Sequence, residues 1–362
     1  VCPGPSCCKF ALNSRISGAD RRIRVTVLGA RMLNSMVETG RIVSIWRYPV
    51  KSMAGERIAT ASLGSLGLHA DRTWAVRDVE SNATTSAKHL PKLMWCTARY
   101  PVDPAPDAGP GHAPEVVIGL PDGREVSSSD PAVHAMLSAY LDRDVELRPL
   151  PPVSDRDAYR GPMATKSDIR TIFGLSPEDP LPDLSMFPVR KLAEISRYAT
   201  PVGSYVDAYP LHLMTEQSLR AMASYAPDSD FDVRRFRPTI LIDWPGQSEQ
   251  EPTEQPELAW CGGVLHAGTA SLAPQIPTVR CVMPSHAQPR LDRDPTVTRT
   301  VAAHARRCLG VYATVAGAGR INEGDSLRFD SPGRQKDPDS LTATIKRAVM
   351  RAISATLPRG RG

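Results

Sequence analysis

The chain has 362 residues, enough for two domains of ordinary size, and a hydrophobic content of 41% allows a normal core. Its small formal net charge of +5, without a dense run of lysine and arginine among aromatic residues, argues against a nucleic-acid-binding protein. No apolar run reaches the roughly 18–20 residues of a membrane helix, and the N-terminal residues lack the apolar core of a signal peptide, so we expect a cytoplasmic protein that binds no membrane.

The cysteines are scattered along the chain. Their odd count and irregular spacing argue against a disulfide framework. No Cys-X-X-Cys pair occurs, which disfavours a zinc ribbon and an iron–sulfur cluster held within the chain. The cysteines are Cys2, Cys7, Cys8, Cys96, Cys261, Cys281 and Cys308.

Residues 1–40 are expected to be a disordered leader or a mis-assigned start. They show no apolar periodicity, and Met36 stands just before the first convincing strand, at residues 41–48. The folded body is therefore expected to begin near Met36. Metal binding by the three cysteines near the N-terminus is the less favoured alternative.

A first domain is predicted over residues 41–150. Its strand signals are short, rich in β-branched or aromatic residues, and separated by glycine turns. One later stretch instead carries apolar side chains at helical spacing. The predicted order is strands at 41–48, 59–63 and 73–77, a loop at 101–113, a helix at 131–141 and a strand at 145–150.

A second domain is predicted over residues 151–330, followed by a linker with an amphipathic helix in residues 331–362. Residues 151–205 are expected to be mostly irregular because of their aspartate and proline clusters. Thr215 can cap a helix with its hydroxyl. The remaining predictions are strands at 239–243, 264–266, 278–283 and 312–315, a polar loop at 246–257, and helices at 295–308 and 341–357.

The element content predicts a mixed α/β, β-rich fold. Many short strands with few helices indicate barrel-like sheets, and they disfavour a doubly wound nucleotide-binding domain. No Gly-X-Gly-X-X-Gly fingerprint is present that would place a flavin or nicotinamide nucleotide.

A series of short motifs runs through the chain in a fixed order. The segment Trp46–Ser52 opens the series, and Gly67–Val76 follows it. The later members are Ser86–Lys88 with Pro91–Leu93, Asp207–Leu213 continuing into Thr215, Ser218 and Leu219, Arg235–Pro238, Arg280 with Cys281, and Gly310–Tyr312 with Gly319, Ile321, Gly324 and Asp325.

In this order the motifs resemble the MOSC family, which includes the mitochondrial amidoxime-reducing component and its bacterial relatives. The resemblance extends over roughly residues 41–328. It implies a β-barrel-like MOSC core preceded by an N-terminal β-barrel-like domain.

Cys281 is the central residue of the resemblance. The family relationship implies that the chain binds a molybdenum cofactor, Mo-molybdopterin, with Cys281 as metal ligand and catalytic residue. A soft thiolate suits that role. A cysteine that follows a strand is otherwise most often a small buried hydrophobe, and this plainer interpretation is kept for Cys96, Cys261 and Cys308.

The resemblance also implies a set of residues around the cofactor phosphate and pterin. Lys51 and Ser52 offer a charge and a hydroxyl, whereas Arg72 and Arg237 offer planar forks suited to phosphate. The alternative for each arginine is a solvated ion pair. Arg280, Thr239 and Tyr312 complete the predicted cofactor-binding set. Thr239 stands where relatives often carry asparagine, which puts a pterin contact there in doubt, and Tyr312 could equally pack in the core.

Asp207 resembles an acidic residue that lies near the metal in relatives. It is the second predicted catalytic residue, because a carboxylate there could orient substrate or relay a proton; a turn aspartate is the alternative. His212 lies in a strand-like run and is expected to be structural.

The leading functional hypothesis is a molybdenum-dependent oxidoreductase that reduces small N-hydroxylated or N-oxide-type substrates. Because the chain shows no cluster, flavin or nucleotide motif of its own, the resemblance implies a separate electron-transfer protein as donor. Two alternatives stay open: a sulfur-transfer protein and a non-catalytic carrier of the molybdenum cofactor.

Overall fold

The structure is a computed structural model that describes residues 38–161, 165–244 and 254–331. The chain divides into two units, Val1–Met36 and Val37–Gly362, and every described residue belongs to the second. The predicted leader at 1–40, apart from its last residues, and the predicted helix at 341–357 lie outside the described residues.

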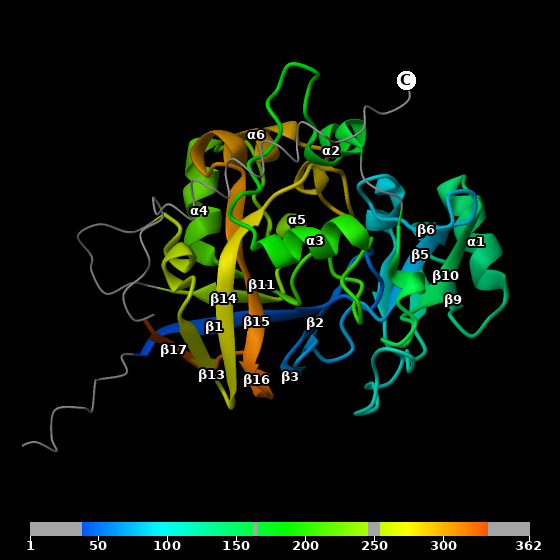
Figure 1. The fold of residues 1–362 in the computed structure, drawn as a ribbon, viewed down its shortest axis with the longest axis horizontal. Helices are drawn as coiled ribbons and strands as arrows, with labels where there is room; N and C mark the ends of the chain where they lie inside the picture. Colours follow the sequence, from blue (N-terminus) through cyan, green and yellow to red (C-terminus); the bar gives the residue numbers. More distant parts are fainter. Residues whose placement is uncertain (1–37, 162–164, 245–253, 332–362) are drawn as a thin grey trace, which may run out of the picture. The chain divides into compact units, whose positions relative to one another are not determined.

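A closed barrel of seven strands dominates the described chain (Figure 1). Going round it, β12 pairs with β11, then β15, β14, β13, β17 and β1 follow, and β1 pairs again with β12. Closure removes the exposed strand edges that an open sheet would present. The strands are β1 (Glu38–Arg47), β11 (Leu211–Thr215), β12 (Ile240–Asp243), β13 (Val264–Ala267), β14 (Ala270–Val279), β15 (Cys308–Gly317) and β17 (Ser326–Asp330).

Strand β1 links the two predicted domains, because it completes a barrel whose other strands come from residues 211–330. Ile42 and Ile45 of this strand are buried in the barrel core, and β2 (Glu56–Ile58) pairs with its far end. The predicted boundary at residue 150 stays a prediction, but the first strand of the predicted N-terminal domain pairs with β12 and β17 of the second predicted domain.

Three small sheets accompany the barrel. They have the orders β10–β5–β6, β16–β3–β4 and β7–β8–β9. Their strands are β3 (Thr60–Gly64), β4 (Gly67–Leu68), β5 (Trp74–Asp78), β6 (Ala83–Thr84), β7 (Thr97–Arg99), β8 (Val117–Gly119), β9 (Glu125–Ser127), β10 (Val145–Pro149) and β16 (Gly319–Asn322).

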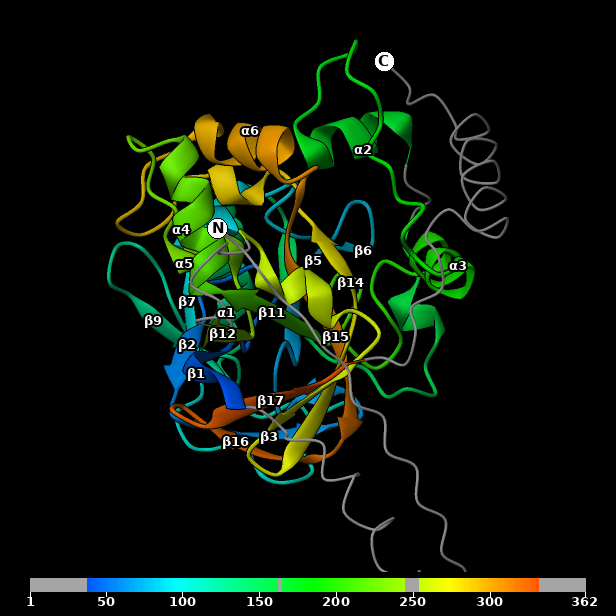
Figure 2. The ribbon, with the colours of Figure 1, turned by 90° about the vertical axis from the view of Figure 1, so that its left-hand side faces the viewer.

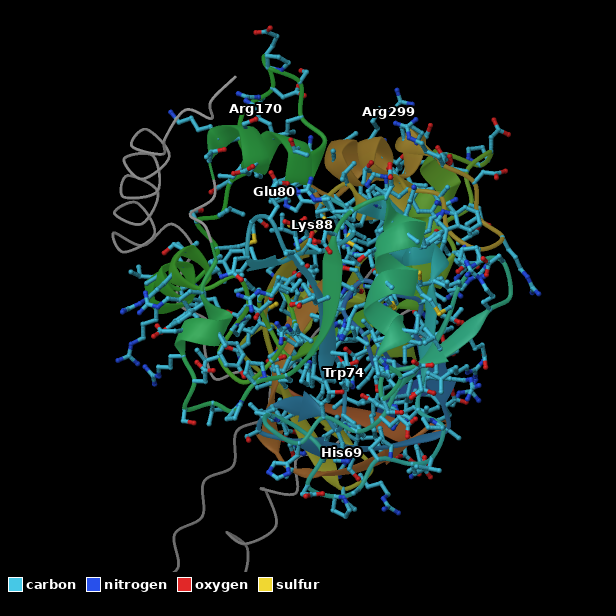
Figure 3. The ribbon with its side chains drawn as sticks, turned by 90° about the vertical axis from the view of Figure 1, so that its right-hand side faces the viewer. His69, Trp74, Glu80, Lys88, Arg170 and Arg299 are labelled. Carbon is cyan, nitrogen blue, oxygen red and sulfur yellow. The ribbon has the colours of Figure 1, made fainter. Side chains whose placement is uncertain are left out.

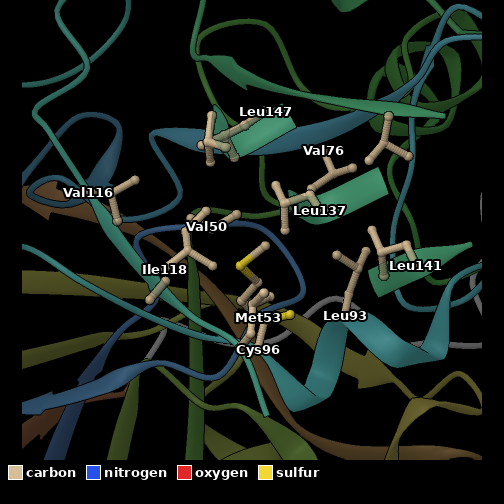
Figure 4. Packing of buried hydrophobic residues seen from close by; sticks show 14 of the residues in the cluster. Val50, Met53, Val76, Leu93, Cys96, Val116, Ile118, Leu137, Leu141 and Leu147 are labelled. Atoms are coloured by element: carbon tan, nitrogen blue, oxygen red, sulfur yellow. The ribbon is translucent and has the colours of Figure 1, made fainter. Parts of the chain in front are cut away.

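A separate apolar cluster forms beneath β5, β8, β10 and helix α1 (Ala132–Leu141) (Figure 4). Val50, Met53 and Cys96 lie at its centre and are fully buried. Burial of this many side chains is the main favourable term that holds these short strands together. Cys96 therefore has the packing role expected from the sequence.

Five further α-helices and four 3-10 helices are described (Figures 1 and 2). Helix α4 begins after Thr215, whose hydroxyl accepts a hydrogen bond from the Ser218 amide, as the sequence predicts. The helices are α2 (Lys166–Phe173), α3 (Val189–Arg197), α4 (Glu216–Tyr225), α5 (Val233–Phe236), α6 (Pro295–His304), η1 (Pro91–Trp95), η2 (Asp157–Tyr159), η3 (Pro256–Trp260) and η4 (Met283–Ser285).

Several sequence predictions of elements were wrong. The predicted strand at 278–283 is the end of β14, which stops at Val279 and is followed by a loop and η4. The helix predicted to reach Cys308 ends at His304, and Cys308 begins β15. Residues 151–205 are mostly irregular, as predicted, but α2 and α3 within them were not predicted, and the end of the predicted loop at 246–257 enters η3.

The fold class was predicted correctly. The described chain is mixed α/β and β-rich, with a closed barrel at its centre. Most of strand β14 was not predicted from the sequence. It contains Pro274 and Pro277, which have no backbone N–H to donate to a neighbouring strand. Both prolines lie where the register of β14 against β15 shifts, so the irregularities accommodate them.

Candidate functional site

Asp207 lies between two lysines. Lys51 Nζ donates to Asp207 Oδ1 at 2.5 Å, and Lys88 Nζ donates to Oδ2 at 2.8 Å. Both lysines are largely shielded from solvent, whereas 44% of the Asp207 side chain is exposed. The carboxylate therefore has one side held by protein and one side open.

The ionisable groups of this cluster shift one another's pKa values. Burial opposes ionisation of Asp207, but Lys51 and Lys88 outweigh it and hold the pKa of the carboxyl well below its usual range. Burial lowers the pKa of Lys51, despite Asp207. Burial also opposes the charge of Lys88, yet Asp207 and Cys281 together raise the pKa of its amine. Asp207 is an anion and Lys88 a cation at neutral pH.

Tyr48 carries two arginines on its ring. The guanidinium carbon of Arg237 lies 4.2 Å from the ring centroid and that of Arg72 lies 4.7 Å away. Burial raises the pKa of the Tyr48 hydroxyl to about 12, so it stays protonated and donates to the Pro238 carbonyl at 3.1 Å. Cation–π contact of this kind stabilises a guanidinium that has lost water.

Arg72 and Arg237 differ in how their charges are balanced. Arg72 forms an ion pair with Asp71, whose other oxygen accepts from the Tyr48 amide at 2.7 Å. Arg237 donates through Nη1 to the Met53 carbonyl at 2.7 Å, and none of the described ion pairs includes it. Burial lowers the pKa of Arg237 to about 10, which still leaves the guanidinium charged at neutral pH.

Two carbonyls on either side of Arg237 fix the loop that carries it. Arg280 Nη2 donates to the Phe236 carbonyl at 2.7 Å, and Tyr48 donates to the Pro238 carbonyl at 3.1 Å. These bonds hold Arg237 at a φ of 54°, a left-handed conformation that is uncommon for a side chain other than glycine. The backbone under the arginine is thus set before any ligand arrives.

Two buried guanidinium nitrogens at this site have no hydrogen-bond partner. They are Nη2 of Arg237 and Nε of Arg280. An unpaired buried donor costs free energy, and each belongs to a side chain with no carboxylate partner among the described ion pairs. Both donors are therefore available to an anionic ligand.

Cys281 follows β14 by two residues and is partly buried. Its thiol packs against the apolar cluster around Met53 and Cys96, and its charge helps to raise the pKa of both Lys88 and Tyr312. Burial first, with Asp207 second, raises the pKa of Tyr312 to about 12. The structure thus brings Cys281 close to the lysine–aspartate cluster.

Two predicted cofactor residues also serve the backbone here. Ser52, at a φ of 71°, accepts a hydrogen bond from the Ala87 amide at 3.0 Å, which ties the first motif to the one that carries Lys88. Thr239 Oγ1 accepts from the His212 amide at 3.1 Å, and the Thr239 amide donates to the His212 carbonyl at 2.8 Å. Either hydroxyl retains its own proton to donate.

Residues 39–118 match the MOSC N-terminal beta barrel domain, and residues 201–328 match the MOSC domain. The chain belongs to the MOSC family. The resemblance drawn from its motifs is thereby confirmed. No curated protein matches the chain.

Solved structures with some likeness to this MOSC protein share little of its sequence. The YUAD protein from Bacillus subtilis is 10% identical, with 82% of this chain and 97% of that chain covered, at a TM-score of 0.37. YiiM from Escherichia coli is 14% identical over 43% of this chain and 83% of its own, at 0.29. YiiM from Geobacillus stearothermophilus is 17% identical, with 41% and 71% covered, at 0.26.

In this MOSC protein the predicted site residues from both halves of the chain come together. Lys51 and Arg72 from the first half meet Asp207, Arg237, Arg280 and Cys281 from the second through shared partners. Figure 3 shows Lys88 within the body of the molecule, whereas Arg170 and Arg299 lie at its upper margin in that view.

Three residues of the site were missed from the sequence. Lys88 and Tyr48 stand inside the motifs, so their position there was the available signal. His212 was expected to be structural, but its Nε2 lies 3.4 Å from Arg280 Nη1. Burial first, with Arg280 second, holds the pKa of His212 well below 6.5, so the ring is neutral at neutral pH.

Two negative findings concern the described part of the chain. It contains no group of three or more histidine, cysteine, aspartate or glutamate side chains that could hold a metal ion by themselves. None of its helices combines the length and apolar character needed to cross a membrane.

Proposed function

We propose that the chain binds Mo-molybdopterin, with Cys281 as the metal ligand, and works as an oxidoreductase on small N-hydroxylated or N-oxide-type substrates. The observation that carries the proposal is the pair of unpartnered donors, Arg237 Nη2 and Arg280 Nε, in the cluster that contains Cys281. A buried donor that lacks a partner points to a missing acceptor.

The electrostatics favour an anionic ligand. Lys51, Lys88, Arg72, Arg237 and Arg280 outnumber Asp71 and Asp207, so the cluster keeps an excess of positive charge. The pterin phosphate is an anion of the size that such forks bind bidentately. A metal that arrives within an organic ligand also needs only one protein thiolate, which fits the absence of a larger metal-binding group among the described side chains.

The roles of the residues follow from their contacts. Arg237 and Arg280 would bind the phosphate and pterin oxygens, with Arg72, Lys51 and Ser52 beside them. When bound, the cofactor would supply two-electron redox chemistry. Tyr312 and Thr239 would flank it. The exposed side of Asp207 would accept a hydrogen bond from an N–H of a basic substrate and so orient it.

The overall reaction consumes two electrons and two protons for each N–OH bond that is broken, and it releases water. Lys88 can hold a proton next to Asp207, whereas the electrons must come from a separate donor protein. Asp207 remains ionised between the two lysines, which suits a role in binding cationic nitrogen compounds.

Metal analysis of the purified chain, followed by a reduction assay with a dithionite-reduced viologen dye, tests the proposal. We expect about one molybdenum atom per chain at full loading and turnover of an amidoxime substrate. Tight molybdenum without turnover would indicate a cofactor carrier, whereas sulfur transfer without reduction would indicate a sulfur-transfer protein. A chain that never binds molybdenum would refute the proposal.

A further inference from the structure

Residues 165–199 form a segment that packs on the site almost without a core of its own. Among these residues only Phe187 is buried. Helices α2 and α3 bury no residue at all, although α1, α4 and α6, of similar length, each bury two or three. Phe187 is thus the one buried side chain of the segment, and Leu184, Met186 and Leu192 pack beside it while only partly buried.

Phe187 makes its contacts with the site. Its ring centroid lies 6.4 Å from that of Tyr209 and 6.5 Å from that of Tyr312. Tyr209 and Tyr312 stack on each other at 5.3 Å, and Tyr312 also contacts His212. The anchor therefore docks on the aromatic pair that borders the charged cluster.

A second attachment lies beside Cys281. The Val282 amide donates to the Ile172 carbonyl at the end of α2, at 2.9 Å, and Arg307 Nη1 donates to the Phe173 carbonyl at 3.3 Å. Gly174 ends α2 in a left-handed conformation, and a Cβ there would lie 3.0 Å from the Val282 side chain. The segment touches the residue that follows Cys281 and, through Phe187, the ring of Tyr312.

Most other hydrogen bonds of the segment are internal. Arg170 Nη1 donates to the carbonyl of Asp179, and the Ser176 amide donates to the Asp179 carboxylate. A region with few buried contacts and mainly local bonds opens at a lower free-energy cost than the barrel beneath it. The segment can therefore move as a unit that keeps its own bonds.

We propose that residues 165–199 are a lid over Cys281, and that Phe187 determines which ligands reach the site by size. With Phe187 docked, small ligands reach the thiol and bulky ones do not. With Phe187 undocked, the lid keeps its backbone attachments at Ile172 and Phe173 but loses its buried side chain, and bulky ligands enter. The inference rests on the proposed site but does not depend on the metal.

The test measures alkylation of Cys281 in the full-length chain produced without cofactor. Iodoacetamide is the small probe and a pyrenyl maleimide the bulky one, with each rate normalised to a free thiol and read by peptide mass spectrometry. In the wild type we expect the normalised alkylation rate of Cys281 to be lower with the bulky probe than with the small one. Phe187→Ala should raise the bulky-probe rate by about tenfold or more, and Phe187→Leu, which keeps an apolar anchor, should restore most of the discrimination.

Phe329→Ala is the matched control, because Phe329 on β17 is a partly buried ring that packs against the barrel core and is remote in sequence from the lid. It should leave the bulky-probe rate at Cys281 unchanged. Cys261, which packs in the same barrel core, reports any general opening of the barrel. Hydrogen exchange should also be faster in α2 and α3 than in β14 and β15.

Three results would overturn the inference: equal normalised rates for the two probes in the wild type, a Phe187→Ala rate no higher than that of Phe329→Ala, or a parallel rise at Cys261. Since the readout is access to the thiol, these failures are distinct from a failure to bind molybdenum.

Discussion

At the scale of single residues, the site depends on guanidinium groups whose planar forks have free donors. Arg280 donates a hydrogen bond from Nη2 to the Phe236 carbonyl, and its Nη1 lies near His212. Its Nε has no hydrogen-bond partner. Arg237 donates a hydrogen bond from Nη1 to the Met53 carbonyl, and its Nη2 has no hydrogen-bond partner. A lysine would keep the charge at either position, but its single nitrogen cannot donate to the loop carbonyl and to a ligand from two separate points as a planar guanidinium does.

We therefore expect Arg237→Lys and Arg280→Lys to retain the fold yet bind the pterin about tenfold or more weakly, the effect of one missing charge-assisted hydrogen bond of about 1.5 kcal/mol or more. Fluorescence of the oxidised pterin released from purified chain measures the loss. Arg299→Lys is the control and should retain full loading, because Arg299 is exposed on α6 and, among the hydrogen bonds of the described residues, its guanidinium donates only to Thr296 of the same helix. Equal loading in all three variants would show that the forks do not hold the cofactor.

His212 gives the site a pH dependence whose sign can be worked out. Its pKa in the fold lies well below the ordinary value of 6.5, chiefly because of burial. The unfolded chain therefore binds the proton first as the pH falls, so stability is fully present above about pH 6.5 and is lost below it. The limiting slope for one such group is about 1.4 kcal/mol per pH unit.

The expected result is a smaller loss of stability in His212→Gln than in the wild type between pH 7 and pH 5, because glutamine does not titrate there but can still accept from Arg280. Urea unfolding at several pH values measures the difference. Parallel stability curves would mean that His212 is protonated in the fold without cost.

At the scale of elements, β15 approaches β11 so closely that one position requires glycine. Gly310 has a φ of 80°, and a Cβ there would lie 2.3 Å from His212 Nε2. Neither strain nor contact can be relieved easily, because His212 is held by Thr239 and Arg280.

Gly310→Ala should lower the free energy of unfolding by about 2–4 kcal/mol, from left-handed strain and the clash together. Gly123→Ala separates the two causes, because Gly123 has a φ of 87° with open space around it, so only about 1–2 kcal/mol of strain is expected. Chemical denaturation compares the pair. Identical losses would remove the argument from close packing against His212.

The elements also show which structural features the sequence could predict. Thr215 and the β-branched run at Ile42 carry local signals, so the helix and strand that they begin were found. Helices α2 and α3 have only 8 and 9 residues, shorter than the window over which apolar periodicity is recognised, and aspartate and proline clusters surround them, so the prediction missed both. The contact of Lys88 with Asp207 joins distant segments, and no local pattern encodes it.

At the scale of the whole molecule, the barrel depends on β1. Without it, β12 and β17 would each expose an unpaired edge. We expect residues 151–330 expressed alone to show no cooperative thermal unfolding, and co-expression with residues 38–150 to restore it. Scanning calorimetry measures whether the fragment unfolds in a cooperative transition. A cooperative transition in the fragment alone would show that the second predicted domain folds without β1.

Under the proposed function, the electrons for reduction would come from a separate donor. Purified chain with NADH alone should give no turnover of an N-hydroxylated substrate, whereas a dithionite-reduced viologen dye should support it. Product formation followed by chromatography measures both. Sustained turnover with NADH alone would reveal a redox site that neither the motifs nor the described residues contain.

The central claim is that Cys281 is the molybdenum ligand, and molybdenum per chain in cysteine variants tests it most directly. Cys281→Ser replaces a soft thiolate with a hydroxyl that stays protonated near neutral pH, so molybdenum and activity should both be lost while circular dichroism shows an intact fold. Cys96→Ser, Cys261→Ser and Cys308→Ser, at thiols whose pKa values burial raises, should keep the metal. A Cys281→Ser chain that retains both molybdenum and activity would contradict the account.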